Sequence, residues 1–176
     1  MENREMGVLR SDLDVDKLLG MLNEALNQEW LTYYQSWIGA ILMEGPMWAE
    51  IKPELFIHSN QEFSHASLIK TRMLELGATL NLHPSGSMKN PYCKVPDNPY
   101  ITVILHQNLM GELSAIERYN EIADFTDGKD ETTHQIVSYI LNEELTHERN
   151  IENWLDAIAL IKSQFSKTHT LHAFIL

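Results

Sequence analysis

The sequence is poor in cysteine, glycine and proline, and it has no long hydrophobic run. Cys93 is the only cysteine among 176 residues, so a single chain cannot build a disulfide framework or a thiolate zinc cluster. The 8 glycines and 6 prolines exclude collagen-like repeats and low-complexity composition. No stretch reaches the roughly 18 apolar residues that a membrane span requires, and the first residues carry no apolar secretory signal. We therefore expect one globular domain, residues 1–176, in a reducing cytoplasm, with no membrane partner.

Positive charge is also scarce. The chain has 13 Lys and Arg residues against 25 Asp and Glu residues, which gives a formal net charge of -12 at pH 7. Residues 112–156 alone hold 12 acidic side chains and three basic ones. Because affinity for nucleic acid comes largely from cationic side chains that neutralise phosphates, this charge disfavours a nucleic-acid partner. An acidic field of this kind favours small cations instead.

Apolar residues recur at helical spacing in four long stretches, and strand-like alternation is nearly absent. The sequence predicts helices over residues 15–43, 48 or 53 to 76, 99–125 and 131–162. Capping residues and Gly or Pro signals mark the ends of these stretches. The pattern indicates an all-α protein. The third stretch is expected to bury Ile101, Leu105, Ile116 and Ala123.

The second and third stretches are joined by a long, helix-poor connection, residues 77–98. At about 3.3 Å per residue it can reach about 70 Å, which exceeds the roughly 40 Å length of each predicted helix. It can therefore join two parallel helices, whereas the short links on either side of it force antiparallel neighbours. The sequence predicts a four-helix bundle, about residues 14–162, with one long crossover between helices two and three. Residues 163–176 are left as a C-terminal tail: a short fifth helix, an interface arm or a flexible end.

A carboxylate interrupts each of the four apolar stripes, and two of these carboxylates are followed by a histidine three residues later. Residues at that spacing share one face of a helix. The two lone glutamates precede the two Glu-x-x-His pairs by 33 and 32 residues, so the chain repeats one helical hairpin plan twice. A bundle of these hairpins brings four carboxylates and two imidazoles to one level of the core. The six candidate ligands are Glu29, Glu62, His65, Glu112, Glu144 and His147.

Four ionised carboxylates in a core need a compensating charge, since one isolated buried ion costs several kcal/mol. Two divalent cations would supply four positive charges against the four negative ones. Oxygen-rich ligands with one imidazole per metal suit iron or manganese better than a closed tetrahedral zinc site. The pattern predicts a dinuclear metal centre in which His65 and His147 each hold one metal. Of the carboxylates, Glu62 and Glu144 are expected to bridge or cap the pair. Of the lone glutamates, Glu29 and Glu112, one is expected to be a terminal ligand and the other to bridge.

Other residues near this level are weaker candidates. A third Glu-x-x-His sequence, Glu131 with His134, is rotated by roughly 140° from the core face and is interpreted as a solvated pair in the first turn. His58 either flanks the site or is an ordinary half-buried histidine, and the second interpretation is favoured. Tyr33, Tyr34 and Tyr119 are candidates to orient carboxylates, to donate an electron to an oxidant or only to pack. Gln28 and Asn108 are either hydrogen-bond partners of the histidines or solvated polar positions.

These residues resemble the ferritin-like superfamily with a bacterioferritin-type di-iron site. The runs NQEWLTYYQSWIGA, RYNEIADFTDGKD and ILNEELTHE are similar to Dps-like proteins that carry such a site. The resemblance implies a ferritin-like four-helix bundle in a dodecameric homo-oligomeric cage, which oxidises Fe(II) with hydrogen peroxide or dioxygen and stores the ferric product. Manganese or zinc would be substitute metals.

The chain departs from that pattern in three places. The related proteins place a cysteine pair near the centre, and here Cys93 fits the first position whereas Ser114 occupies the second. Phe63 stands where a methionine would bind haem, so haem is not expected. No lysine precedes Lys17, unlike the lysine-rich tails with which Dps proteins bind DNA.

The predicted function is therefore that of a ferroxidase that stores iron and protects against oxidative stress. A di-iron oxygenase or peroxidase, or a dimanganese catalase, would use the same ligands without a cage. The remaining alternative is a non-enzymatic structural or DNA-coating bundle.

Overall fold

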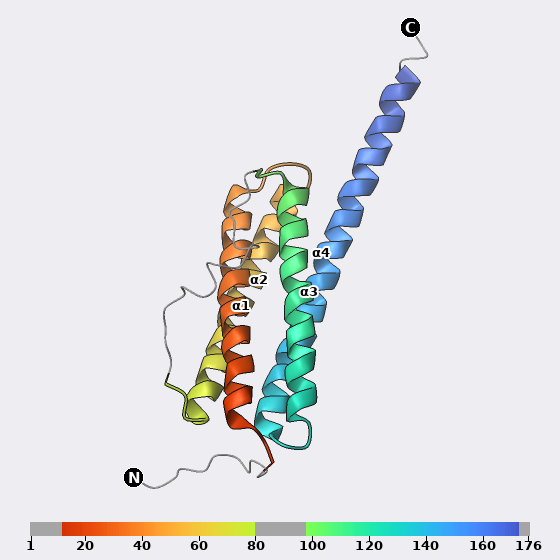
Figure 1. Ribbon diagram of the computed structural model, residues 1–176. Coiled ribbons are helices and arrows are strands. Elements are labelled where there is room, and N and C mark those ends of the chain that lie inside the picture. The colour runs from red at the N-terminus through yellow and green to blue at the C-terminus, as the bar shows by residue number, and fades with distance from the viewer. Residues whose placement is uncertain (1–11, 80–97, 173–176) are drawn as a thin grey trace.

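Four helices make up the part of the chain that the computed structural model describes, residues 12–79 and 98–172, with side chains up to residue 165. The helices are α1 (Val15–Leu42), α2 (Trp48–Glu75), α3 (Ile101–Thr126) and α4 (Glu131–His172). They lie side by side as a bundle (Figure 1). The all-α prediction is confirmed. None of the described helices is both long and apolar enough to cross a membrane.

The helix ends follow the local signals in the sequence. The side chain of Asp14 accepts a hydrogen bond from the backbone N of Lys17 at 3.0 Å and so caps α1. The side chain of Asp130 accepts one from the backbone N of Thr133 at 3.1 Å at the start of α4. Gly77 follows α2 with φ 87°, a left-handed conformation that glycine adopts without strain. Helix α3 begins at Ile101, two residues after the predicted start.

The chain direction agrees with a single crossover. Helices α1 and α2 form one antiparallel hairpin and α3 and α4 the other, while α1 packs on α3 and α2 on α4. Helices α2 and α3 run in the same direction, so α2 ends and α3 begins at opposite ends of the bundle (Figure 1). The predicted connection falls largely on residues 80–97, which lie outside the described residues, and Cys93 lies among them.

The hydrophobic core is divided into two clusters. One cluster is built around residues such as Leu22, Ile69 and Ile140, and the other around residues such as Leu55, Leu105 and Ile151. Apart from Arg72, Thr126, Asp130 and Thr133, the described residues that are both buried and polar fall between the two clusters along the chain. The midsection of the bundle is therefore polar.

Helix α3 buries a slightly different face from the predicted one. Ile101 and Leu105 are buried as expected, but Ile116 and Ala123 are only half-buried. Ala115 and Ile122, each one residue earlier, take their places. The buried positions follow a period near 3.5 residues because packed helices of a bundle wind around each other, and this winding shifts the face from that of an isolated helix.

Helix α4 is longer than predicted. The expected end was Lys162, but the helix continues to His172 and projects beyond the other three helices (Figure 1). Residues 163–172 therefore continue α4 and do not form a separate fifth helix, whereas residues 173–176 lie outside the described residues. The segment after Ile158 contains no glycine or proline that would end a helix, although Leu160 and Phe165 are 60% and 66% exposed there.

Candidate metal centre

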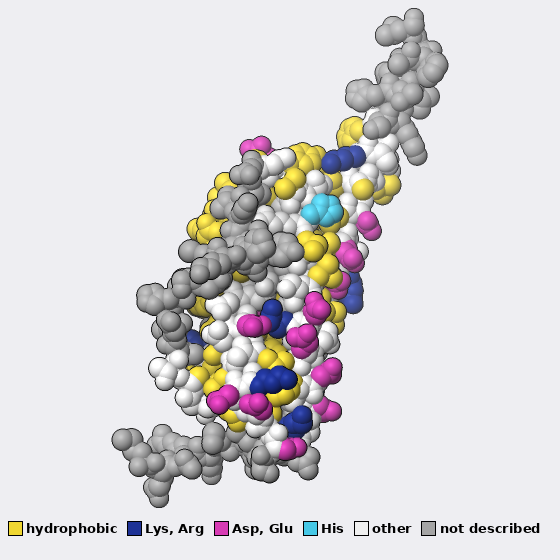
Figure 2. All heavy atoms as spheres, viewed as in Figure 1, with side chains coloured by type: hydrophobic (Ala, Val, Ile, Leu, Met, Phe, Trp, Pro, Cys, Tyr) yellow, Lys and Arg dark blue, Asp and Glu magenta, His cyan; other side chains and the backbone are white. Residues whose placement is uncertain are grey.

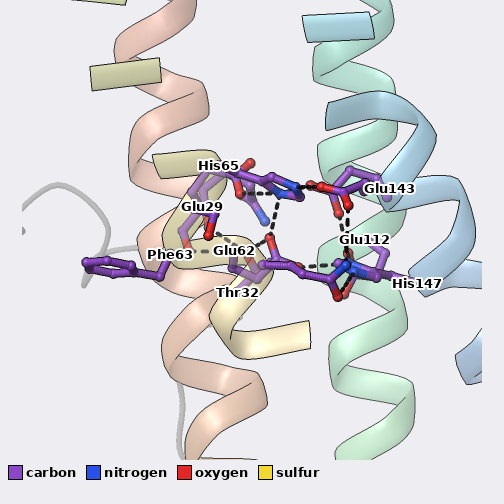
Figure 3. Close-up of polar contacts among 12 residues, drawn as sticks. Glu29, Thr32, Glu62, Phe63, His65, Glu112, Glu143 and His147 are labelled. Atoms are coloured by element: carbon purple, nitrogen blue, oxygen red, sulfur yellow. Dashed lines mark hydrogen bonds and ion pairs between the residues drawn. The ribbon is translucent and has the colours of Figure 1, made fainter. Parts of the chain in front are cut away.

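The polar midsection brings all six candidate ligands together. Each helix contributes: α1 carries Glu29, α3 carries Glu112, and α2 and α4 carry the two Glu-x-x-His pairs. All six side chains are buried, because every one of them faces the bundle axis. In Figure 3 five of them converge from the surrounding helices, while Phe63 points away from the cluster. The five labelled there are Glu29, Glu62, His65, Glu112 and His147.

The two histidines occupy equivalent positions. The Nδ1 atom of His65 lies 3.4 Å from Oε2 of Glu29, and the Nδ1 atom of His147 lies 3.7 Å from Oε2 of Glu112. Each ring thus faces the lone glutamate of its own hairpin. This is the arrangement expected from the repeated hairpin plan.

The other two glutamates lie between the histidines. Glu144 places Oε1 3.0 Å from Nδ1 of His65 and Oε2 3.3 Å from Nδ1 of His147. Glu62 places Oε2 3.5 Å from Nδ1 of His65 and Oε1 3.0 Å from Nδ1 of His147. Each of these carboxylates therefore presents one oxygen to each side, which is the geometry of a bridging ligand.

Three overlapping groups of possible ligand atoms result, and within each group the atoms lie within 4.8 Å of one another. One of them joins His58 to Glu112 and His147, and the other two contain only the six candidate ligands. The first of these two groups, called the His65 position below, consists of Glu29, Glu62, His65 and Glu144. The second group, called the His147 position, consists of Glu62, Glu112, Glu144 and His147. Neither lone glutamate belongs to both groups.

The cluster lacks compensation from protein cations. Among the described residues, no lysine or arginine forms an ion pair with any of its four glutamates. Each of the six residues also has at least one buried nitrogen or oxygen atom without a hydrogen-bond partner. Such atoms are costly in a core, and divalent cations would satisfy them. The donor set of four carboxylates and two imidazoles fits two hard or borderline cations.

Without metal, the charges are balanced by protons. Burial raises the pKa of Glu29 and Glu112 well above the ordinary value, and neighbouring carboxylates act in the same direction. Burial opposes protonation of the histidines, but hydrogen bonds with the carboxylates outweigh it, so the pKa of His65 is raised and that of His147 reaches about 12. Burial also opposes ionisation of Glu62, but hydrogen bonds with both histidines lower its pKa. Cations that bind here must displace these protons.

The outer nitrogens of the histidines belong to a second layer of contacts. Nε2 of His65 lies 2.7 Å from Oε2 of Glu143, and Nε2 of His147 lies 3.1 Å from Oε1 of Gln61. Gln61 and Glu143 each come directly before a ligand glutamate, and each contacts the histidine of the other helix. The sequence therefore contains the pattern Gln/Glu-Glu-x-x-His twice, with Gln61 and Glu143 in its first position. The spacing within one helix does not show that each of these residues contacts the histidine of the other helix.

The two residues expected to support the histidines lie elsewhere. Gln28 donates a hydrogen bond to the backbone oxygen of Gly111 at 3.4 Å, and Asn108 bonds with Ser36 at 2.8 Å and with the backbone of Ile104. That prediction is wrong, because both side chains bridge α1 and α3 rather than reach α2 or α4.

Two hydroxyl groups hold carboxylates of the centre. The phenol of Tyr119 donates a hydrogen bond to Oε1 of Glu29, in line with the predicted role of orienting a carboxylate. Thr32 donates to Oε2 of Glu62 at 3.3 Å. Tyr33 is half-buried and Tyr34 is exposed, and the rings of both pack against other aromatic residues.

His58 is more deeply buried than the favoured interpretation allowed, at 2% exposed. Its ring stacks on that of His147, with centroids 4.1 Å apart, and on that of Trp154 at 5.4 Å. Burial and the nearby His147 lower the pKa of His58 to about 3, so it is neutral. His58 thus flanks the centre uncharged. Its buried Nδ1 has no hydrogen-bond partner, and it offers a ligand atom within 4.8 Å of those of Glu112 and His147.

The remaining Glu-x-x-His sequence lies apart from the centre, as predicted. Glu131 is exposed and accepts a hydrogen bond from Gln135 at 2.7 Å, and His134 contacts the backbone oxygen of Ala123. The negative charge of the chain gathers nearby: Figure 2 shows acidic side chains along the side of the molecule formed by α3 and α4.

The fold and the site together are those of a four-helix-bundle protein with a buried site of carboxylates and imidazoles in its midsection. The comparisons with known proteins agree with this class of protein. Residues 19–161 match the family model for the ferritin-like domain. The chain is 33% identical over 161 residues to the DNA protection during starvation protein of Pyrococcus furiosus, covering 87% of this chain and 84% of that protein.

Solved structures give the same result. The dodecameric thioferritin of Bacteroides fragilis, a bacterioferritin-related protein, is 41% identical, with a TM-score of 0.84 over 87% of this chain and 92% of that one. The bacterioferritin of Rhodobacter capsulatus is 25% identical, with a TM-score of 0.72 over 85% and 89% of the two chains. The chain belongs to the ferritin-like domain family.

Proposed function

We propose that this protein is a ferroxidase that oxidises Fe(II) at the six-residue centre and stores the ferric product in a homo-oligomeric cage. The observation that carries the proposal is the position of Glu62 and Glu144, which each present one oxygen to either histidine. The proposed ligands are those of the His65 and His147 positions together.

The reaction needs two Fe(II) ions and a two-electron oxidant. With hydrogen peroxide, two Fe(II) give two electrons and two protons are consumed, so the products are two Fe(III) and two waters. The four carboxylates would neutralise two divalent ions, and two positive charges would be left uncompensated once both ions are oxidised to Fe(III). Removing ferrous iron and peroxide together limits the formation of hydroxyl radicals.

The cage is proposed from the relatives. The Bacteroides fragilis protein, at 41% identity, is described as dodecameric. The Pyrococcus furiosus protein is named for the protection of DNA, but the net charge of -12 in this chain disfavours direct contact with DNA. We propose that any such protection comes from the chemistry of iron rather than from DNA binding.

Anaerobic Fe(II) loading followed by peroxide or dioxygen tests the activity, with the rise of ferric absorbance as the readout. Glu62→Ala removes an oxygen from each metal position and is expected to abolish the fast initial phase. Glu131→Gln, in the remaining Glu-x-x-His sequence, is the matched control and should leave the phase unchanged. Unchanged initial oxidation in Glu62→Ala would contradict the assigned site.

Metal analysis with size-exclusion chromatography tests the storage function. A particle near twelve subunits that carries iron is expected. A metal-free dimer would count against the cage, and retention on DNA at low salt would support the non-enzymatic alternative. A rapid peroxide turnover with bound manganese would support a catalase.

A further inference from the structure

We infer that the two metal positions of the proposed centre are unequal: the His65 position binds its metal first and more tightly, and the His147 position exchanges. This inference rests on the proposed function, because it concerns the same six ligands. It comes from the contacts behind the ligands, which differ although the ligands themselves repeat.

The side chains behind the histidines form one continuous chain of hydrogen bonds. Gln61 donates its Nε2 hydrogen to Oε1 of Glu143 at 3.3 Å, which leaves its Oε1 facing Nε2 of His147. A carbonyl oxygen only accepts, so Nε2 of His147 donates. Oε2 of Glu143 likewise accepts from Nε2 of His65. Both rings therefore carry hydrogen on Nε2 when they bind a metal, and both present the lone pair of Nδ1 to the centre.

The acceptors at the two ends of this chain differ in charge. His65 donates at 2.7 Å to a carboxylate, whereas His147 donates at 3.1 Å to a neutral amide. A carboxylate behind a metal-bound imidazole increases its basicity and fixes its orientation, and loss of such a partner typically costs 10- to 100-fold in metal affinity. His65 is therefore the stronger donor of the two.

The lone glutamates differ in the same sense. Oε1 of Glu29 accepts the hydrogen bond of Tyr119, so its other oxygen is fixed toward His65. Both oxygens of Glu112 lack a hydrogen-bond partner. A fixed ligand loses less conformational freedom when a metal binds. The bond from Tyr119 withdraws some charge from Glu29, but it does so at the oxygen that faces away from the metal position.

Two independent contacts thus favour the same position. The His65 position has a charged partner behind its imidazole and a fixed terminal carboxylate, and the His147 position has neither. The expected order is that a first cation occupies the His65 position, after which a second enters and leaves at the His147 position.

Titration of the metal-free protein with Co(II), without any oxidant, tests the inference through the ligand-field absorbance of bound cobalt. The wild type is expected to bind two Co(II) ions per chain, with dissociation constants that differ at least tenfold. Glu143→Gln, which removes only the charge, should weaken the tighter step by about 10- to 100-fold. Glu112→Gln should keep the tight step, whereas Glu29→Gln should lose it.

The decisive variant exchanges the two partners. Gln61→Glu combined with Glu143→Gln places the carboxylate behind His147 and the amide behind His65, with the same atoms available for the hydrogen-bond chain. In that background the two dissociation constants should move closer together, because only the hydrogen bond from Tyr119 to Glu29 still favours the His65 position. Adding Tyr119→Phe should then reverse the order, so that Glu29→Gln keeps the tighter step and Glu112→Gln loses it. Two equal steps in the wild type, or an unchanged ratio of the two dissociation constants after the exchange, would overturn the inference alone. Failure of the wild type to bind two Co(II) per chain would overturn the proposed function as well.

Discussion

The phenol of Tyr119 on α3 donates a hydrogen bond to Glu29 on α1, and both side chains are completely buried. The Tyr119→Phe variant leaves that carboxylate oxygen without a partner. Unsatisfied buried groups cost about 1–3 kcal/mol. Urea denaturation of the metal-free variant should therefore give a free energy of unfolding that is lower than that of the wild type by an amount in that range. Tyr34→Phe, at an exposed position on α1, is the control. Equal stability of the Tyr119→Phe variant and the wild type would show that the bond contributes nothing.

The buried ion pair between Arg72 and Asp130 links α2 to the start of α4. The Nη2 atom of Arg72 lies 2.9 Å from both carboxylate oxygens of Asp130, and its Nε donates to Thr133 at 2.8 Å. Asp130→Asn removes the charge from one partner and leaves a buried guanidinium. Urea unfolding at pH 7 should show a loss of about 3–5 kcal/mol. Asp124→Asn, on the exposed face of α3, should change stability by little.

The same pair predicts a dependence on pH. Burial opposes ionisation of Asp130, but hydrogen bonds from Thr133 and Arg72 lower its pKa below the ordinary value. A carboxyl with a lowered pKa in the folded state stabilises the protein above its unfolded pKa, and the contribution is lost as the pH falls through the folded pKa. The stability gap between the wild type and Asp130→Asn should be constant above about pH 5 and should shrink below about pH 4. A gap independent of pH would contradict this assignment.

Two glycines of α1 should respond to alanine in opposite ways. A Cβ atom at Gly39 would lie 2.8 Å from the side chain of Ile104 on α3, whereas a Cβ atom at Gly20 meets nothing within 4 Å. Gly39→Ala should destabilise the bundle by about 1–3 kcal/mol through overpacking. Gly20→Ala should stabilise it by about 0.5–1 kcal/mol because alanine is the better helix former. Thermal unfolding of both variants measures the difference, and a stabilising Gly39→Ala would show that α1 and α3 can separate freely.

Metal binding should stabilise the fold and release protons. A ligand at 100 times its dissociation constant adds about 2.7 kcal/mol per site. Zn(II) should therefore raise the thermal unfolding midpoint of the wild type. The midpoint of Glu62→Ala should rise much less. Because the raised pKa values of His65 and His147 keep protons on the metal-free cluster, a weakly buffered solution at neutral pH should acidify when Zn(II) is added. Binding that becomes tighter as the pH falls would contradict this account.

Much of the fold is visible in the sequence because local signals and long-range packing agree. Asp14 and Gly77 bound helices where they were expected, and the apolar periodicity gives four long helices. The end of α4 was misjudged because a run without glycine or proline remains helical beyond the bundle. The buried face of α3 was shifted by one residue because winding among neighbours is a property of the assembled bundle rather than of one helix.

The convergence of the six candidate ligands follows from their spacing, but their surroundings do not. Gln28 and Asn108 have suitable side chains on buried faces, yet each is committed to the contact between α1 and α3. Glu143 and Gln61 support the opposite histidines because α2 and α4 are antiparallel and their registers align. Such pairings depend on the relative axial placement of two helices, which no spacing within one helix specifies.

The polar midsection also separates two hydrophobic clusters, one toward each end of the bundle. Each end then has its own apolar interior, and an opening fluctuation that starts at one end meets the buried cluster of carboxylates before it reaches the other. Cations tied to ligands on all four helices would join the two ends into one cooperative unit. Amide hydrogen exchange would then show two local opening free energies in the metal-free protein and a single global one in the metal-bound protein.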